Sequence, residues 1–123
     1  MYIKSINTYF IENPKCGSGT LDYVLKSMFP IEDMAVGGFV PIEYAMRRIP
    51  EDAKIFGVVR HPLDRLVSSV RMGCRNAEQA DEQLKSVIKG MDLTHGRILY
   101  HVYGPQTRYV SNSSRIQLFP FER

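Results

Sequence analysis

Two apolar segments of the chain, residues 7–13 and 53–59, each lead directly into a turn and then into a helical pattern. Both segments are short and rich in β-branched or aromatic residues, which predicts buried strands. After the first, apolar residues at i, i+3, i+4 and i+7 predict a helix from Thr20 that ends before Pro30. After the second, Pro62 stands at the first position of another predicted helix. Strands that alternate with helices favour a layered α/β domain with a mainly parallel sheet.

The rest of the chain adds shorter elements to this pattern. Residues 34–40 are a weak strand or a loop, and a short helix is expected over residues 41–49. Residues 76–91 have acids early and lysines late around an apolar stripe, which predicts a surface helix, and a last strand is expected near residues 115–119. A length of 123 residues suits a single hydrophobic core, so we predict one domain over residues 1–123.

Composition and charge disfavour several classes of protein. The formal net charge is +3 and the basic residues occur in short runs, so we expect no nucleic-acid partner. The two cysteines, Cys16 and Cys74, lack disulfide-framework or zinc-ligand spacing, which predicts free thiols in a reducing compartment and no metal site. The amino terminus lacks the pattern of a signal peptide, and no apolar run approaches the length of a membrane helix. We therefore expect a cytoplasmic protein without a membrane span.

The first strand-to-helix turn reads PKCGSGT over residues 14–20 and contains one lysine, two glycines and two hydroxyl side chains. Backbone N–H groups at a helix amino terminus carry partial positive charge, and ligands of parallel sheets bind at that edge. In the usual nucleotide-triphosphate loop, the lysine follows the glycines and precedes a magnesium-binding hydroxyl. Here Lys15 precedes both Gly17 and Gly19. The turn thus favours a phosphate or sulfate ligand and disfavours a P-loop kinase or NTPase.

The second turn offers a complementary set of groups. Arg60 stands at the end of its strand, and Ser68 follows about two helical turns later. Because both turns are predicted at the same edge of the sheet, Arg60 and Ser68 would bind a second anion. Asp64 and Arg65 lie in the first turn of the helix, where charges commonly serve the helix dipole and surface pairing, so we assign them a structural role.

Together, the segments NPKCGSGTLDYVL and FGVVRHPLDRLVSSVR resemble the paired signature of the sulfotransferases that use 3′-phosphoadenosine 5′-phosphosulfate (PAPS), especially the carbohydrate-modifying and related bacterial and viral branches. In that family a P-K-x-G-[ST]-[ST] loop holds the 5′-phosphosulfate, and an R-[DN]-P-x-[DE]-R-x-x-S segment holds the 3′-phosphate. This chain has Gly19 where a hydroxyl residue is common and His61 in place of Asp or Asn. The segments GPQTRYV and RIQLFPFE also look like later parts of the family.

The resemblance implies an α/β fold, a three-layer P-loop-like domain whose mainly parallel central sheet is flanked by helices. It also implies a sulfotransferase that moves the sulfuryl group of PAPS to a hydroxyl or amine acceptor, such as a carbohydrate, without an obligatory metal ion. Lys15 would then act in catalysis by stabilising charge on the departing 5′-phosphate. The cofactor-binding residues that the resemblance implies are Lys15, Cys16, Gly17, Ser18, Gly19, Thr20, Arg60 and Ser68.

The resemblance provides no clear match for the base that deprotonates the acceptor. Related enzymes place a catalytic His or Glu between the two motifs, and this chain has no His between Lys15 and Arg60. Glu43 is the candidate, at a distance from Lys15 similar to that of the catalytic Glu in the heparan sulfate branch. The alternative interpretation of Glu43 is an exposed acid in the first turn of a short helix. Glu32 and Asp33 are alternative bases with less positional support. His61 adjoins Arg60, which favours a structural or nucleotide-edge role over that of a base, and His95 and His101 are predicted to lie in a loop.

The chain is shorter than fuller members of the family, which continue past the last strand. Such a minimal core would use an open acceptor site, form a homodimer, or retain nucleotide binding after losing catalysis. The alternative function is therefore a non-catalytic protein on the same fold that binds PAPS or its product adenosine 3′,5′-bisphosphate, or that serves as an interaction module.

Overall fold

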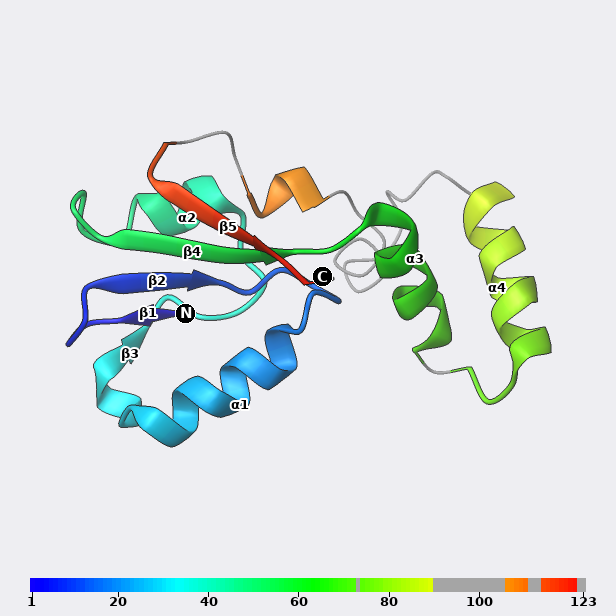
Figure 1. Ribbon diagram of the computed structural model, residues 1–123, viewed down its shortest axis with the longest axis horizontal. Coiled ribbons are helices and arrows are strands. Elements are labelled where there is room, and N and C mark those ends of the chain that lie inside the picture. Colours follow the sequence, from blue (N-terminus) through cyan, green and yellow to red (C-terminus); the bar gives the residue numbers. More distant parts are fainter. Residues whose placement is uncertain (73, 90–105, 111–113, 122–123) are drawn as a thin grey trace.

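The computed structural model describes residues 1–72, 74–89, 106–110 and 114–121, and Figure 1 shows how their elements are arranged. Within these residues, five strands form one sheet in the order β3-β1-β2-β4-β5. In chain order the strands are β1 (Tyr2–Ile3), β2 (Thr8–Ile11), β3 (Met34–Ala35), β4 (Lys54–Val59) and β5 (Ile116–Pro120). The helices are α1 (Ser18–Met28), α2 (Ile42–Met46), α3 (Pro62–Arg71) and α4 (Ala77–Lys89), with short 3-10 turns η1 (Ile31–Asp33) and η2 (Gln106–Arg108).

The sheet is mixed, so the prediction of a mainly parallel, three-layer P-loop-like domain is wrong. β2 pairs with β4 and β4 with β5 in parallel, but β1 pairs antiparallel with both β2 and β3. The cause is a tight turn after Ile3, in which the Asn7 N–H donates to the Lys4 carbonyl at 3.1 Å. A turn this short can join only antiparallel strands. β1 is two residues long, which is too short to give a periodic signal in the sequence.

The two strand–turn–helix units expected from the sequence are confirmed. β2 leads into α1, and β4 leads into α3, with Pro62 at the start of α3 as predicted. Ile11 of β2 lies opposite Gly57 of β4, and Val59 of β4 lies opposite Pro120 of β5. The carboxyl ends of the three parallel strands therefore meet at one edge of the sheet, and both turns leave from that edge (Figure 1).

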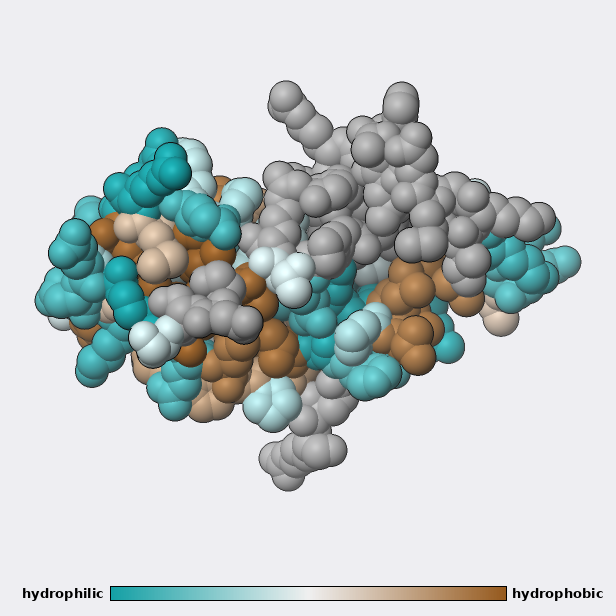
Figure 2. All heavy atoms as spheres, turned by 90° about the horizontal axis from the view of Figure 1, so that it is seen from above, coloured by the Kyte–Doolittle hydropathy of each residue, from teal (hydrophilic) through white to brown (hydrophobic). Residues whose placement is uncertain are grey.

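Helices pack on the two faces of the sheet through separate apolar clusters. On one face, Ile42 and Ala45 of α2 pack with Tyr9 and Ile55 in a cluster of nearly fully buried side chains. On the other, Leu25 of α1 packs with the buried start of the chain. α4 packs against α3, beyond the carboxyl edge of the strands (Figure 1). In the view of Figure 2, apolar residues are exposed over the part that contains the sheet, whereas the α4 end is mainly hydrophilic.

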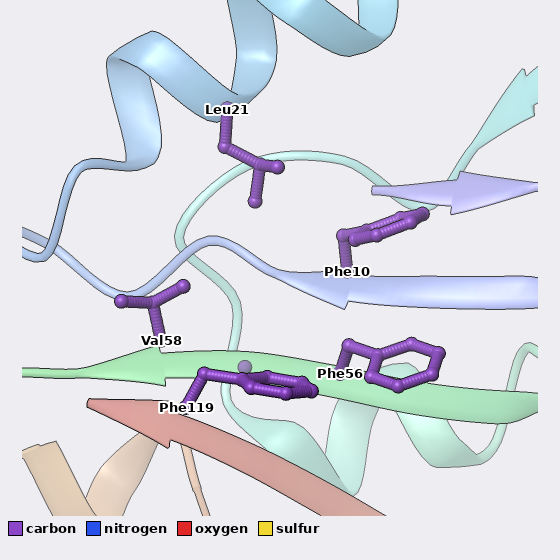
Figure 3. A pocket seen from close by; sticks show the side chains of 6 residues that line it. Phe10, Leu21, Phe56, Val58 and Phe119 are labelled. Carbon is purple, nitrogen blue, oxygen red and sulfur yellow. The ribbon is translucent and has the colours of Figure 1, made fainter. Parts of the chain in front are cut away.

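The face that carries α1 has an apolar pocket beside the helix. Phe10, Phe56 and Phe119 come from three adjacent parallel strands, and their rings stack with centroids 6.1 and 5.9 Å apart. With Leu21 of α1 and Val58, they line a pocket of about 240 Å³ (Figure 3). Phe119 remains 44% exposed, so α1 covers this row of rings only in part. Among the described helices, none has the length and apolar character needed to cross a membrane.

Candidate anion-binding site

The two turns meet in one pocket at the carboxyl edge of the parallel strands. The pocket has a volume of about 460 Å³. The register that places Ile11 beside Gly57 brings the turns together, because each follows its strand within a few residues. From the first turn the pocket is lined by Pro14, Lys15, Gly17, Ser18, Gly19 and Thr20, and from the second by Arg60 and Ser68. Of the predicted cofactor-binding residues, Cys16 alone does not line it.

The backbone of the first turn is sharply bent before α1 begins. Lys15 and Gly17 have φ values of 63° and 79°, in the left-handed region that residues other than glycine rarely adopt. Gly17 is the N-cap residue of α1, and within the described part of the chain no side chain caps the helix. The first N–H groups of α1 therefore retain their capacity to bind an anion, and the helix dipole favours negative charge there.

Two cationic side chains lie at this turn, Lys15 from the turn itself and Arg60 from just after the end of β4. The Lys15 ammonium lies 3.5 Å from the Met72 sulfur, which is a weak acceptor. The Arg60 guanidinium donates to the Lys15 carbonyl at 3.4 Å and lies over the Phe121 ring, 4.9 Å from its centroid. Among the described residues, no carboxylate forms an ion pair with Lys15, so its charge remains available to an anionic ligand.

Three apolar residues are the remaining described residues that line the pocket, and the sequence analysis assigned none of them to a site. They are Phe39, Met72 and Phe121. Phe121 packs directly on the first turn, since a Cβ built on Gly17 would lie 2.8 Å from its ring. The three residues come from separate segments that only the tertiary fold brings together. The RIQLFPFE segment, noted for its resemblance, contains Phe121, but no pattern in the sequence indicated that the three residues meet at one pocket.

Arg65 is a buried side chain that contacts the first turn from the interior of the protein. Its side chain is only 5% exposed, and its guanidinium donates to the Pro14 carbonyl at 3.2 Å. Burial lowers the pKa of this guanidinium from its usual value. The structural role expected for Arg65 is thus supported, although through burial and not through surface pairing. Asp64 does lie at the surface, with its carboxylate 3.8 Å from His61 Nδ1.

Two buried side chains tie the first turn to the rest of the fold. Asn13 Nδ2 donates to the Val58 carbonyl at 3.0 Å and to Gln106 Oε1 at 3.1 Å. Cys16 is 2% exposed, and its thiol donates to the same Gln106 oxygen at 3.3 Å. Neither Cys16 nor Cys74 forms a disulfide bond, which agrees with the prediction of thiols. Cys16 therefore contributes to the turn through its buried side chain, while the pocket is lined by its neighbours.

The structure does not bring the predicted base into the pocket. Glu43 is exposed in the first turn of α2 and is not among the lining residues. Asp33 is engaged elsewhere, since its carboxylate accepts hydrogen bonds from the N–H and the hydroxyl of Ser5. Glu12, which the sequence did not single out, accepts a hydrogen bond from the Gly38 N–H at 2.9 Å, next to Phe39 of the pocket. The candidates His95 and His101 lie outside the described residues.

The groups gathered at the site suit an anionic ligand. It combines two cations, side-chain hydroxyls and uncapped helix N–H groups in one concave surface. Among residues 1–72, 74–89, 106–110 and 114–121, no group of three or more His, Cys, Asp or Glu side chains is arranged to hold a metal ion.

In comparisons with known proteins, no family model, no curated protein and no solved structure matches this chain.

Proposed function

We propose that this pocket binds PAPS and that the protein is a sulfotransferase acting on a hydroxyl or amine acceptor, such as a carbohydrate. The observation that supports the proposal is the convergence of the two anion motifs on one pocket, with Lys15 from the first and Arg60 from the second. The donor set fits a ligand with two separate anionic groups. Lys15, Ser18, Thr20 and the N–H groups of α1 would receive the 5′-phosphosulfate, and Arg60 and Ser68 the 3′-phosphate.

In the transfer, the acceptor oxygen or nitrogen forms a bond to sulfur while the bond between sulfur and the bridging oxygen of the 5′-phosphate breaks. The chain's role is to orient the donor and to stabilise the negative charge that grows on the departing phosphate. We assign this role to Lys15 and the first N–H groups of α1, because Lys15 lines the pocket and no described side chain caps the helix. The products are the sulfated acceptor and adenosine 3′,5′-bisphosphate, and the acceptor's proton passes to a base. Glu43 stays the predicted base, although it lies outside the pocket lining.

The alternative function is a protein that binds PAPS or adenosine 3′,5′-bisphosphate without catalysis. One observation favours it: among the described residues that line the pocket, none carries a carboxylate or an imidazole. A base that deprotonates an acceptor hydroxyl would therefore have to come from a residue outside the described pocket lining. Transfer of radiolabelled sulfate from PAPS to any member of a panel of glycans, phenols and amines would exclude this alternative.

Binding of adenosine 3′,5′-bisphosphate, measured by titration calorimetry, tests the core of the proposal. Lys15→Ala and Arg60→Ala each remove one charge-assisted contact, which corresponds to about tenfold weaker binding or more. Lys26→Ala and Arg48→Ala remove exposed cations engaged elsewhere, with Asp22 and the Tyr44 ring, and are the matched controls. The binding constant of the controls should stay near the wild-type value. A wild-type protein that does not bind the bisphosphate would refute the proposal.

A further inference from the structure

Gln106 lies at the junction of the two anion-binding turns, far from both in the sequence. It is the first residue of η2, drawn in orange in Figure 1. We propose that Gln106 is a positioning residue that sets the spacing between two anion subsites. The first subsite is the turn that carries Lys15, and the second is formed by Arg60 and Ser68. The proposal rests on the function proposed above, because it concerns how one ligand with two anionic groups is held.

The Gln106 side-chain amide forms hydrogen bonds with both the N–H and the carbonyl of Arg60. The Arg60 N–H donates to Gln106 Oε1 at 3.0 Å, and Gln106 Nε2 donates to the Arg60 carbonyl at 2.6 Å. A residue in a β-strand exchanges the same pair of hydrogen bonds with the backbone of its neighbour. Here the Gln106 side chain takes the place of that neighbour, directly after the end of β4. It also fixes the orientation of the amide, since the reversed amide would place donor against donor.

The same amide oxygen also holds the first turn. It accepts hydrogen bonds from Asn13 Nδ2 at 3.1 Å and from the Cys16 thiol at 3.3 Å. Asn13 and Cys16 are 1% and 2% exposed, so these bonds are shielded from water and hold the turn from its buried side. A single side chain thereby links residues on both sides of Lys15 to the backbone of Arg60.

Gln106 is itself anchored in the core. Its carbonyl accepts a hydrogen bond from the Tyr109 N–H at 2.8 Å, and Tyr109 is fully buried in the cluster that contains Tyr9 and Ile55. The backbone of η2 at Gln106 is therefore anchored next to a residue of the hydrophobic core. From this position Gln106 contacts both turns through one amide. Arg60 also contacts the first turn directly but more weakly, since its guanidinium donates to the Lys15 carbonyl at 3.4 Å.

Spacing matters most for a ligand that must reach both subsites at once. When one anionic group is bound, the second binds as if at high local concentration, provided that its subsite is held at the right distance. Loosening the junction lowers this advantage without removing either set of donors. Loss of Gln106 is thus expected to weaken binding of a two-anion ligand and to spare a one-anion ligand.

The test compares adenosine 3′,5′-bisphosphate with adenosine 5′-monophosphate on wild type, Gln106→Met and Gln117→Met by titration calorimetry. Methionine keeps the length of glutamine but removes the amide oxygen and the amide N–H groups. Gln117, which is exposed on β5, is the matched control. We expect the wild type and Gln117→Met to prefer the bisphosphate by about tenfold or more. In Gln106→Met this preference should fall by about fivefold, while affinity for the monophosphate changes by less than about twofold.

A preference that persists in Gln106→Met would overturn the positioning role, and so would an equal loss of affinity for both nucleotides. If circular dichroism shows that Gln106→Met does not fold, Gln106→Glu carries the test. Its carboxylate keeps an acceptor for the Arg60 N–H but loses the donor to the Arg60 carbonyl, so the preference should still fall. An unchanged preference in Gln106→Glu would then overturn the role. A wild type that binds neither nucleotide would instead refute the proposed function, and the positioning role with it.

Discussion

Replacing Gly17 with alanine is expected to destabilise the protein and to weaken anion binding. Gly17 has a φ of 79° and is the N-cap residue of α1. Alanine in this left-handed conformation costs about 1–2 kcal/mol. Its Cβ would also lie 2.8 Å from Cε2 of Phe121. Because Phe121 is 49% exposed, its ring can move aside, so we expect the backbone strain to account for most of the loss.

Two other glycines of the chain provide matched controls. Gly19 lies inside α1, and a Cβ there would meet no atom within 4 Å. Because alanine is the better helix former by up to about 1 kcal/mol, Gly19→Ala should be neutral or stabilising. Gly38 has a φ of 90° with nothing within 4 Å of its Cβ position, so Gly38→Ala reports backbone strain without a steric contact.

The assay is urea unfolding followed by circular dichroism, with bisphosphate binding measured on the same samples. Gly17→Ala should lose about 1–2 kcal/mol in the free energy of unfolding, and Gly19→Ala should lose none. The loss that Gly17→Ala causes in a Phe121→Ala background isolates the backbone strain, because no ring remains there for the Cβ to meet. The difference between this loss and the loss in the wild-type background gives the contact of the Cβ with the ring. Equal stability of Gly17→Ala and Gly19→Ala would refute the reasoning, because the two substitutions differ mainly in the backbone conformation at the site.

Three further predictions concern side chains near the turns and in the core. Arg65→Met leaves the buried Pro14 carbonyl without its donor and should lower the free energy of unfolding by about 2 kcal/mol in urea titrations; no loss would contradict a supporting role. Ser68→Ala, at the pocket, should weaken bisphosphate binding by about threefold or more in calorimetry. Its neighbour Ser69, whose hydroxyl donates to the Arg65 carbonyl, is the control, and Ser69→Ala should leave the affinity within about twofold of wild type. Burial raises the pKa of Tyr9 above its usual value of about 10, so above that pH the unfolded chain loses the phenol proton while the folded protein keeps it. Stability should fall as pH rises past about 10, and less steeply in Tyr9→Phe; identical slopes in urea titrations at alkaline pH would contradict this.

The elements that the sequence predicted well are those with a periodic pattern or a strong boundary signal. β4 and α3 follow from an apolar run that ends before Pro62, and α1 follows from helical spacing, beginning at Ser18 where Thr20 was predicted. The site residues that could not be predicted are those placed by long-range contacts. Gln106 reaches the turns through its amide, and Phe121 reaches Gly17 through its ring. Both residues lie in segments that resemble later parts of the sulfotransferase family, GPQTRYV and RIQLFPFE, but that resemblance gave neither residue a role, and their contacts depend on the tertiary fold.

The error in the predicted fold and the juxtaposition of the two turns have separate physical origins. The antiparallel pairing involves β1 and β3, which occupy one side of the sheet, whereas the turns follow β2 and β4. What places Lys15 near Arg60 is the parallel pairing of β2 with β4, and the direction of β1 does not alter it. A parallel pair with a helix after each strand is enough to bring two helix amino termini to one edge. The pocket therefore depends on a local parallel unit, and it can form in a mixed sheet as well as in a fully parallel one.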